Sequence, residues 1–115
     1  MADVQELYDK AYDLLCDGNT DEAIAAYKSI LEINPTHVEA VHDLAHAYAD
    51  SNRLDEAIAT AQRLTDLTPE DPMSFTVLSR FYQQNGMVPE AEAAAAKARM
   101  LDWKRQLLEK KQAKA

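Results

Sequence analysis

The chain contains an internal repeat with a period of 34 residues. The segments TDEAIAAYKSILEINP (20–35), LDEAIATAQRLTDLTP (54–69) and VPEAEAAAAKARMLDW (88–103) align at that constant offset. Glutamate, alanine and a residue that tolerates a left-handed backbone recur in register, namely Glu22, Glu56, Glu90, Ala23, Ala57, Ala91, Gly18, Asn52 and Gly86. A period of this length is typical of arrays in which each unit packs only against its neighbours.

Each unit has the pattern of two helices joined by a short turn. In the second unit, apolar residues follow a helical spacing at Val38, Val41, Leu44, Ala45 and Tyr48. The sequence predicts helices over 3–17, 21–34, 37–51, 55–68, 72–85 and 89–112. The alanines in register are small enough to let the two helices of a unit approach closely where they cross.

Capping signals mark two of these helix starts. Thr36 with Glu39 fits a T-x-x-E capping box, so we expect Thr36 to cap the third helix. Asp71 can cap the fifth helix, and Pro72 suits its first turn because a missing N–H costs nothing there.

The pattern resembles the tetratricopeptide repeat, whose motif is W-x2-L-G-x2-Y in the first helix, A-x3-F in the second and a closing proline. The matching residues are Leu7, Ala11, Leu14, Ala23, Tyr27 and Pro35 in the first unit, Val41, Leu44, Ala45, Tyr48, Ala57, Ala61 and Pro69 in the second, and Phe75, Leu78, Ser79, Tyr82, Ala91 and Ala95 in the third. Lys10 stands where the motif has leucine.

This resemblance covers residues 4–103 and implies an all-α fold. That fold is a right-handed superhelical stack of three helix-turn-helix hairpins with an extended C-terminal capping helix. We expect one domain over 1–115, with repeats at about 4–37, 38–71 and 72–103 and an extension over 104–115.

The charge of the chain is divided between a body and a tail. The net charge is −8, but residues 1–96 hold 18 acidic and five basic side chains, whereas residues 97–115 hold seven basic and two acidic ones. An acidic body argues against nucleic acid as the ligand, since phosphate contacts need clustered Lys and Arg. No apolar run is long enough for a membrane span. The single Cys16 favours a reducing, cytoplasmic setting.

In repeats of this family, the first helices line a concave groove. By register with the family, the side chains expected to face this groove and to contact a bound peptide are Gln5, Tyr8, Tyr12, Glu39, His42, His46, Met73, Thr76 and Arg80. Some members clamp a peptide carboxylate with Lys, Asn and Arg, but here the matching places carry Tyr8, Tyr12, Asp43, Met73 and Val77. A heat-shock chaperone tail is therefore disfavoured, and the acidic rim favours a ligand with some positive charge.

The groove contains the one motif that suggests metal chemistry. His42 and His46 stand one turn apart in H-D-L-A-H, one methylene from the H-E-x-x-H of zinc proteases. The Asp43 side chain is one carbon shorter than the glutamate of that motif. His37 lies too far before His42 in the sequence to be the third ligand that such a site needs. We expect no metal centre and no cofactor, although an i, i+4 histidine pair remains able to bind a divalent ion weakly.

The third unit departs from the pattern at its end. Trp103 replaces the closing proline, so we expect the last helix to continue past Leu108. Two interpretations of this extension stay open. It caps the open end of the stack, or its exposed stripe of Met100, Trp103, Leu107 and Leu108 pairs with another chain and makes a homo-oligomer.

Together these features predict a non-catalytic protein–protein interaction module that binds a peptide or helical segment in the groove, as an adaptor, assembly factor or chaperone-like partner. The alternative is a structural module that self-associates through its last helix.

Overall fold

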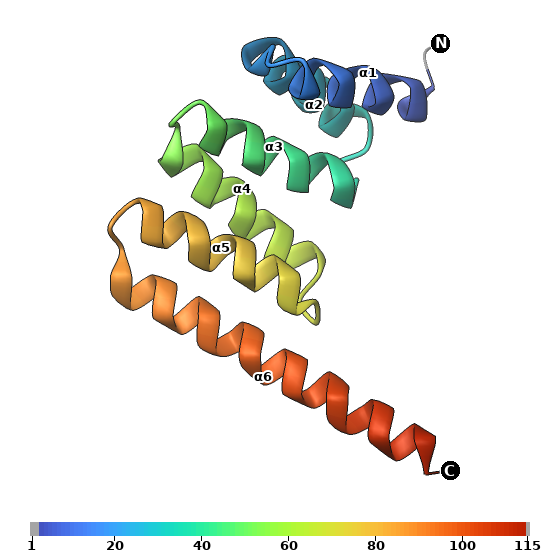
Figure 1. Ribbon diagram of the computed structural model, residues 1–115. Coiled ribbons are helices and arrows are strands. Elements are labelled where there is room, and N and C mark those ends of the chain that lie inside the picture. Colours follow the sequence, from blue (N-terminus) through green and yellow to red (C-terminus); the bar gives the residue numbers. More distant parts are fainter. Residues whose placement is uncertain (1–2, 115) are drawn as a thin grey trace.

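The computed structural model describes residues 3–114, and all of its regular structure is helical (Figure 1). These residues form six α-helices, and each predicted boundary lies within one residue of the observed one. The helices are α1 (Val4–Cys16), α2 (Thr20–Ile33), α3 (Val38–Asp50), α4 (Leu54–Leu67), α5 (Pro72–Gln84) and α6 (Val88–Ala113). Residues 1, 2 and 115 of the predicted domain lie outside the described residues.

The helices pack as three successive hairpins, α1 with α2, α3 with α4 and α5 with α6, which stack through α2 on α3 and α4 on α5 (Figure 1). The alanines in register belong to the core: Ala23 and Ala57 have no exposed surface, and Ala91 is buried as well. The core continues through every hairpin, because Tyr27, Ile30, Val41 and Phe81 are also buried. The predicted all-α stack of three hairpins is confirmed.

The turn inside each hairpin has the same geometry in all three repeats. Gly18, Asn52 and Gly86 adopt positive φ angles of 85°, 60° and 75°. The next residue in each case donates its N–H to a carbonyl five positions earlier, at 2.8 to 2.9 Å, which is the hydrogen bond of a Schellman helix end. Since a left-handed backbone favours Gly and Asn, the sequence signal and its structural cause agree.

The start of α3 differs from the prediction. His37, not Thr36, is the N-cap: its Nδ1 accepts the Ala40 N–H at 3.1 Å. Thr36 instead donates its hydroxyl to Asn34 Oδ1 at 3.2 Å. The capping-box assignment was therefore wrong, because the turn after α2 is one residue longer than the motif implies. Asp71 caps α5 as predicted, accepting the Met73 N–H at 3.0 Å.

Helix α6 closes the stack and then continues beyond it. Its buried residues, Ala91, Ala94, Ala98 and Leu101, all lie in the half that packs on α5. Residues 102–114 are exposed, and Figure 1 shows this part of α6 projecting from the body to the C-terminus. We call residues 102–114 the extension. Lys104 and Arg105 pair with Glu70 and Asp71 just before α5, but the extension buries none of its own side chains, so its apolar stripe is exposed.

Candidate functional site

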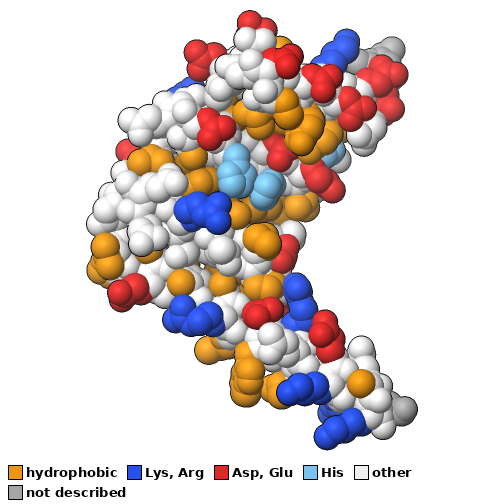
Figure 2. All heavy atoms as spheres, in the orientation of Figure 1, with side chains coloured by type: hydrophobic (Ala, Val, Ile, Leu, Met, Phe, Trp, Pro, Cys, Tyr) orange, Lys and Arg blue, Asp and Glu red, His pale blue; other side chains and the backbone are white. Residues whose placement is uncertain are grey.

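The side chains predicted for the groove come from the first helix of each hairpin, α1, α3 and α5. Figure 2 shows a hollowed face with histidine side chains in its middle and hydrophobic side chains on both sides of them. Acidic side chains gather over α1, and Lys and Arg gather over the C-terminal half of α6. We call this face the groove.

One hollow of about 240 Å³ brings together four of the predicted residues, Tyr8, Glu39, His42 and Met73. It is completed by Val38, Asp43, Leu64, Asp71 and Ser74. Three successive repeats thus contribute to one cavity, which a single hairpin could not form. We call it the first hollow.

Aromatic rings extend this hollow along α1. The Tyr8 ring stacks on Tyr12 with centroids 6.4 Å apart and on His37 at 5.4 Å. Tyr12 is 49% exposed although it is large and largely apolar. An exposed aromatic ring that is oriented by its neighbours is the kind of side chain that anchors protein ligands.

Asp43 organises the first hollow. The Tyr8 hydroxyl donates to Asp43 Oδ2 at 2.5 Å, and the buried Tyr27 hydroxyl donates to the same oxygen at 3.2 Å. His42 Nδ1 lies 3.1 Å from Asp43 Oδ1, and an ionised carboxylate can only accept, so the imidazole N–H donates. Asp43 therefore fixes a tyrosine of α1, a tyrosine of α2 and the next histidine of its own helix.

The electrostatics of this cluster follow from its burial. Burial by itself would raise the pKa of the Asp43 carboxyl, but hydrogen bonds from His42, Tyr8 and Tyr27 outweigh it and hold that pKa below the usual range. Burial and the adjacent Asp43 charge raise the pKa of Tyr8 and Tyr27. Asp43 is thus a carboxylate, and both tyrosines keep their protons.

Sequence reasoning missed this role of Asp43. Asp43 was compared only with the glutamate of the zinc-protease motif and with a position of the carboxylate clamp. The signal that could have found it is Tyr27, which stands where the repeat motif has phenylalanine. A buried tyrosine hydroxyl needs a hydrogen-bond partner, and the hollow supplies one.

The two histidines have different surroundings. Their rings lie 4.6 Å apart, but His46 also meets the edge of the Phe81 ring at 5.4 Å. Burial lowers the pKa of His46, and the neighbouring His42 lowers it further. His42 has 40% of its side chain exposed. His46 therefore forms part of the groove floor, and His42 lies at the surface of the first hollow.

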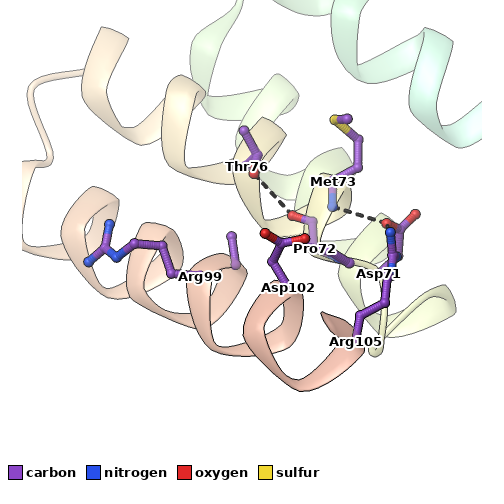
Figure 3. Close-up of a pocket in the computed structure, with 8 residues that line it drawn as sticks. Asp71, Pro72, Met73, Thr76, Arg99, Asp102 and Arg105 are labelled. Carbon is purple, nitrogen blue, oxygen red and sulfur yellow. Dashed lines mark hydrogen bonds and ion pairs between the residues drawn. The ribbon is translucent and has the colours of Figure 1, made fainter. Parts of the chain in front are cut away.

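A second hollow of about 410 Å³ adjoins the first, and Met73 lines both. Figure 3 shows its walls: Asp71, Pro72 and Thr76 come from the start of α5, and Arg99, Asp102 and Arg105 face them from α6. Arg105 lies 3.8 Å from the Asp71 carboxylate. Met73 points away from α6 in this view and is 61% exposed.

The remaining predicted groove residues are placed as follows. Thr76 lines the second hollow but donates its hydroxyl back to the Pro72 carbonyl at 3.1 Å. Gln5 lines neither hollow and donates to Asp9 at 3.0 Å. Arg80 is exposed and close enough to help lower the pKa of His46. The predicted residues that line neither hollow are thus Gln5, Tyr12, His46 and Arg80.

The structure also bears on the metal interpretation. Among the residues it describes, no three His, Cys, Asp or Glu side chains are placed to hold a metal ion. His42 Nδ1 is occupied by Asp43, and His37 uses its Nδ1 to cap α3. His37 is therefore oriented toward a backbone N–H.

Helical hairpins of constant length, stacked so that their first helices share one concave face, define a repeat protein of the solenoid class. The tetratricopeptide repeat model matches residues 14–78, and the chain belongs to that family. No curated protein matches the chain in sequence. Within residues 3–114, none of the helices has the length and apolar character needed to cross a bilayer.

Solved structures share the fold at low sequence identity. MamA of strain MSR-1 superposes with a TM-score of 0.82 at 22% identity, covering 90% of this chain and 59% of MamA. SycD, a type III secretion translocator chaperone of Yersinia enterocolitica, gives 0.81 at 15% identity, covering 96% and 84%. A chain of the CopN–Scc3 complex gives 0.82 at 18% identity, covering 85% and 58%. This chain thus spans about three fifths of the length of MamA.

Proposed function

We propose that this protein is a non-catalytic interaction module whose groove binds an amphipathic, net basic segment of a protein chain. The observation that supports this most is the pair of adjoining hollows: Met73 lines both, Glu39 and Asp43 line the first, and the exposed Tyr12 ring stacks on Tyr8 beside it. Apolar rings offer contact area to aliphatic or aromatic anchors, and Glu39 with Asp43 favours a positively charged ligand.

The chemistry of the first hollow supports binding rather than catalysis. All three of Asp43's close partners use it as an acceptor, so it has the role of positioning Tyr8 and His42. A general base needs a free lone pair directed at a substrate proton. Relatives in fold are consistent with protein binding, because SycD is a translocator chaperone and CopN–Scc3 is a complex.

Selection from a library of short displayed peptides tests this proposal. We expect the selected peptides to be net basic with aliphatic or aromatic anchors, and to bind the purified full chain. The double variant Tyr12→Ala/Glu39→Lys changes only exposed groove side chains and should weaken their binding by about tenfold or more. Circular dichroism should show unchanged helical content.

A matched variant controls for surface charge and apolar area. Glu32→Lys/Ile33→Ala changes one acid and one exposed apolar residue at the end of α2, away from both hollows. This control should bind the selected peptides as the unchanged protein does. If the groove variant binds equally well, or if no peptide is selected, the groove is not a binding site for protein segments.

A further inference from the structure

We propose that the groove of one copy binds the end of α6, residues 100–113, of a second copy of this chain. This inference rests on the proposed function and identifies the ligand. The ligand is thus an amphipathic basic helix that already exists in the folded protein.

The end of α6 carries an apolar stripe that no other part of residues 3–114 covers. Met100, Trp103 and Leu107 follow one another at spacings of three and four, so they share one side of the helix. Trp103 is 63% exposed and Met100 62%, and Leu108 next to the stripe is also exposed. The stripe points away from Ala91, Ala94, Ala98 and Leu101, which pack on α5. Amphipathic helices that bind in grooves contact them through apolar side chains at spacings of this kind.

The helix is preformed, which favours binding. Starting a helix is the costly step, and here the half of α6 that packs on α5 provides the nucleus. Lys104 also pairs with Glu70 at 3.5 Å, and Arg105 with Asp71 at 3.8 Å. The extension is therefore ordered before it meets a partner, so that less conformational entropy is lost on association.

Charge complementarity favours the groove as the surface that binds the extension. The extension carries five basic side chains, Lys104, Arg105, Lys110, Lys111 and Lys114, against Asp102 and Glu109. The residues that line the first hollow include Glu39, Asp43 and Asp71 and no Lys or Arg, and Figure 2 shows acidic side chains over α1 and basic ones over the C-terminal half of α6. Pairing two extensions with each other would instead bring like charges together.

The two surfaces cannot meet within one molecule. Helix α6 is continuous from Val88 to Ala113, and its exposed end extends about 18 Å past Leu101 at 1.5 Å per residue. The first hollow lies on α1, α3 and α5, and Figure 1 shows α1 and the extension at opposite ends of the stack. A second copy brings the complementary faces together in a heterologous, end-to-groove contact.

Two full-length variants test this contact. The extension variant, Trp103→Ala/Leu107→Ala, removes two of the three side chains of the stripe and keeps the groove. The groove variant, Tyr12→Ala/Glu39→Lys, keeps the stripe. We expect each variant alone to sediment as a monomer at concentrations where the unchanged protein associates, and an equimolar mixture to form a one-to-one dimer. Val88→Ala removes another exposed apolar residue of α6 and should associate like the unchanged protein.

The other outcomes are distinguishable. If the groove variant associates by itself, the extensions pair with each other and the inference is wrong. If the unchanged protein and the mixture both stay monomeric at all concentrations, the groove does not bind this helix, and the inference fails as well. In either case, peptides that bind the groove would still support the proposed function. If the groove selects no peptides, the proposed function and this inference are both wrong.

Discussion

Tyr8 and Asp43, which are 35 residues apart, are joined by a hydrogen bond of 2.5 Å that links the first helices of two successive repeats. The buried Tyr27 hydroxyl shares the same carboxylate oxygen. The bond has two effects: it ties repeat one to repeat two, and it holds the Tyr8 ring where it lines the first hollow. Stability and the shape of the groove thus depend on one carboxylate.

Replacing Asp43 by alanine should lower the free energy of unfolding by about 1–3 kcal/mol, because the Tyr27 hydroxyl is left buried without an acceptor. Urea unfolding followed by circular dichroism measures this change. Asp43→Asn retains a carbonyl acceptor and should lose less. Equal losses in the two variants would show that the hydrogen bonds to Asp43 contribute little.

The hydrogen bonds to Asp43 also predict how the free energy of unfolding depends on pH. The pKa of Asp43 is lower in the folded protein than in the unfolded chain, so the unfolded state binds the proton more readily. Its contribution is fully present above the ordinary aspartate pKa and is lost as the pH falls through that value and then through the lower folded pKa. Urea midpoints measured across this acid range should fall more steeply for the unchanged protein than for Asp43→Asn. Parallel curves would contradict this assignment.

The equivalent turns at Asn52 and Gly86 allow the cost of a positive φ angle to be measured. Gly86 has a φ of 75°, and an added Cβ would meet no atom within 4 Å, so Gly86→Ala tests conformation alone. We expect a loss of about 1 kcal/mol in the free energy of unfolding. Asn52→Gly, at the equivalent turn with a φ of 60°, should be neutral within about 0.5 kcal/mol. An alanine that costs nothing at Gly86 would mean that the turn relaxes to another conformation.

Trp103 is the only tryptophan, and its fluorescence therefore reports on the stripe. If a second copy covers it, its emission should shift to the blue as protein concentration rises, and added salt should reverse part of the shift because charge assists the contact. Trp103→Ala itself should change the free energy of unfolding by less than about 0.5 kcal/mol, since the side chain is exposed. Emission that does not vary with concentration would argue against burial of Trp103.

Sequence patterns were sufficient for features that depend on local residues or on period. The turns at Gly18, Asn52 and Gly86 require a left-handed residue, and the alanines in register require close helix crossings, so both were predictable. The cap of α3 was not, because Thr36 and His37 can each accept a backbone N–H and the course of the preceding turn decides between them. Asp43 was missed because its partners Tyr8 and Tyr27 lie on other helices.

For the extension, the sequence could show that nothing stops α6 at Trp103, but not on which side of the stack the helix would leave. That direction is set by the packing of Ala94, Ala98 and Leu101 on α5. The exposure of Trp103 and Leu107 follows from it.

The proposed ligand of the groove is a basic amphipathic helix. The direct measurement is an NMR titration of the isotope-labelled, full-length Trp103→Ala/Leu107→Ala variant with a synthetic peptide of residues 99–114. We predict saturable shifts concentrated at Tyr8, His42 and Met73, and none at Ile33, which is exposed outside both hollows. Shifts that avoid the groove, or no shifts at peptide concentrations where the unchanged protein self-associates, would show that the groove does not bind this helix.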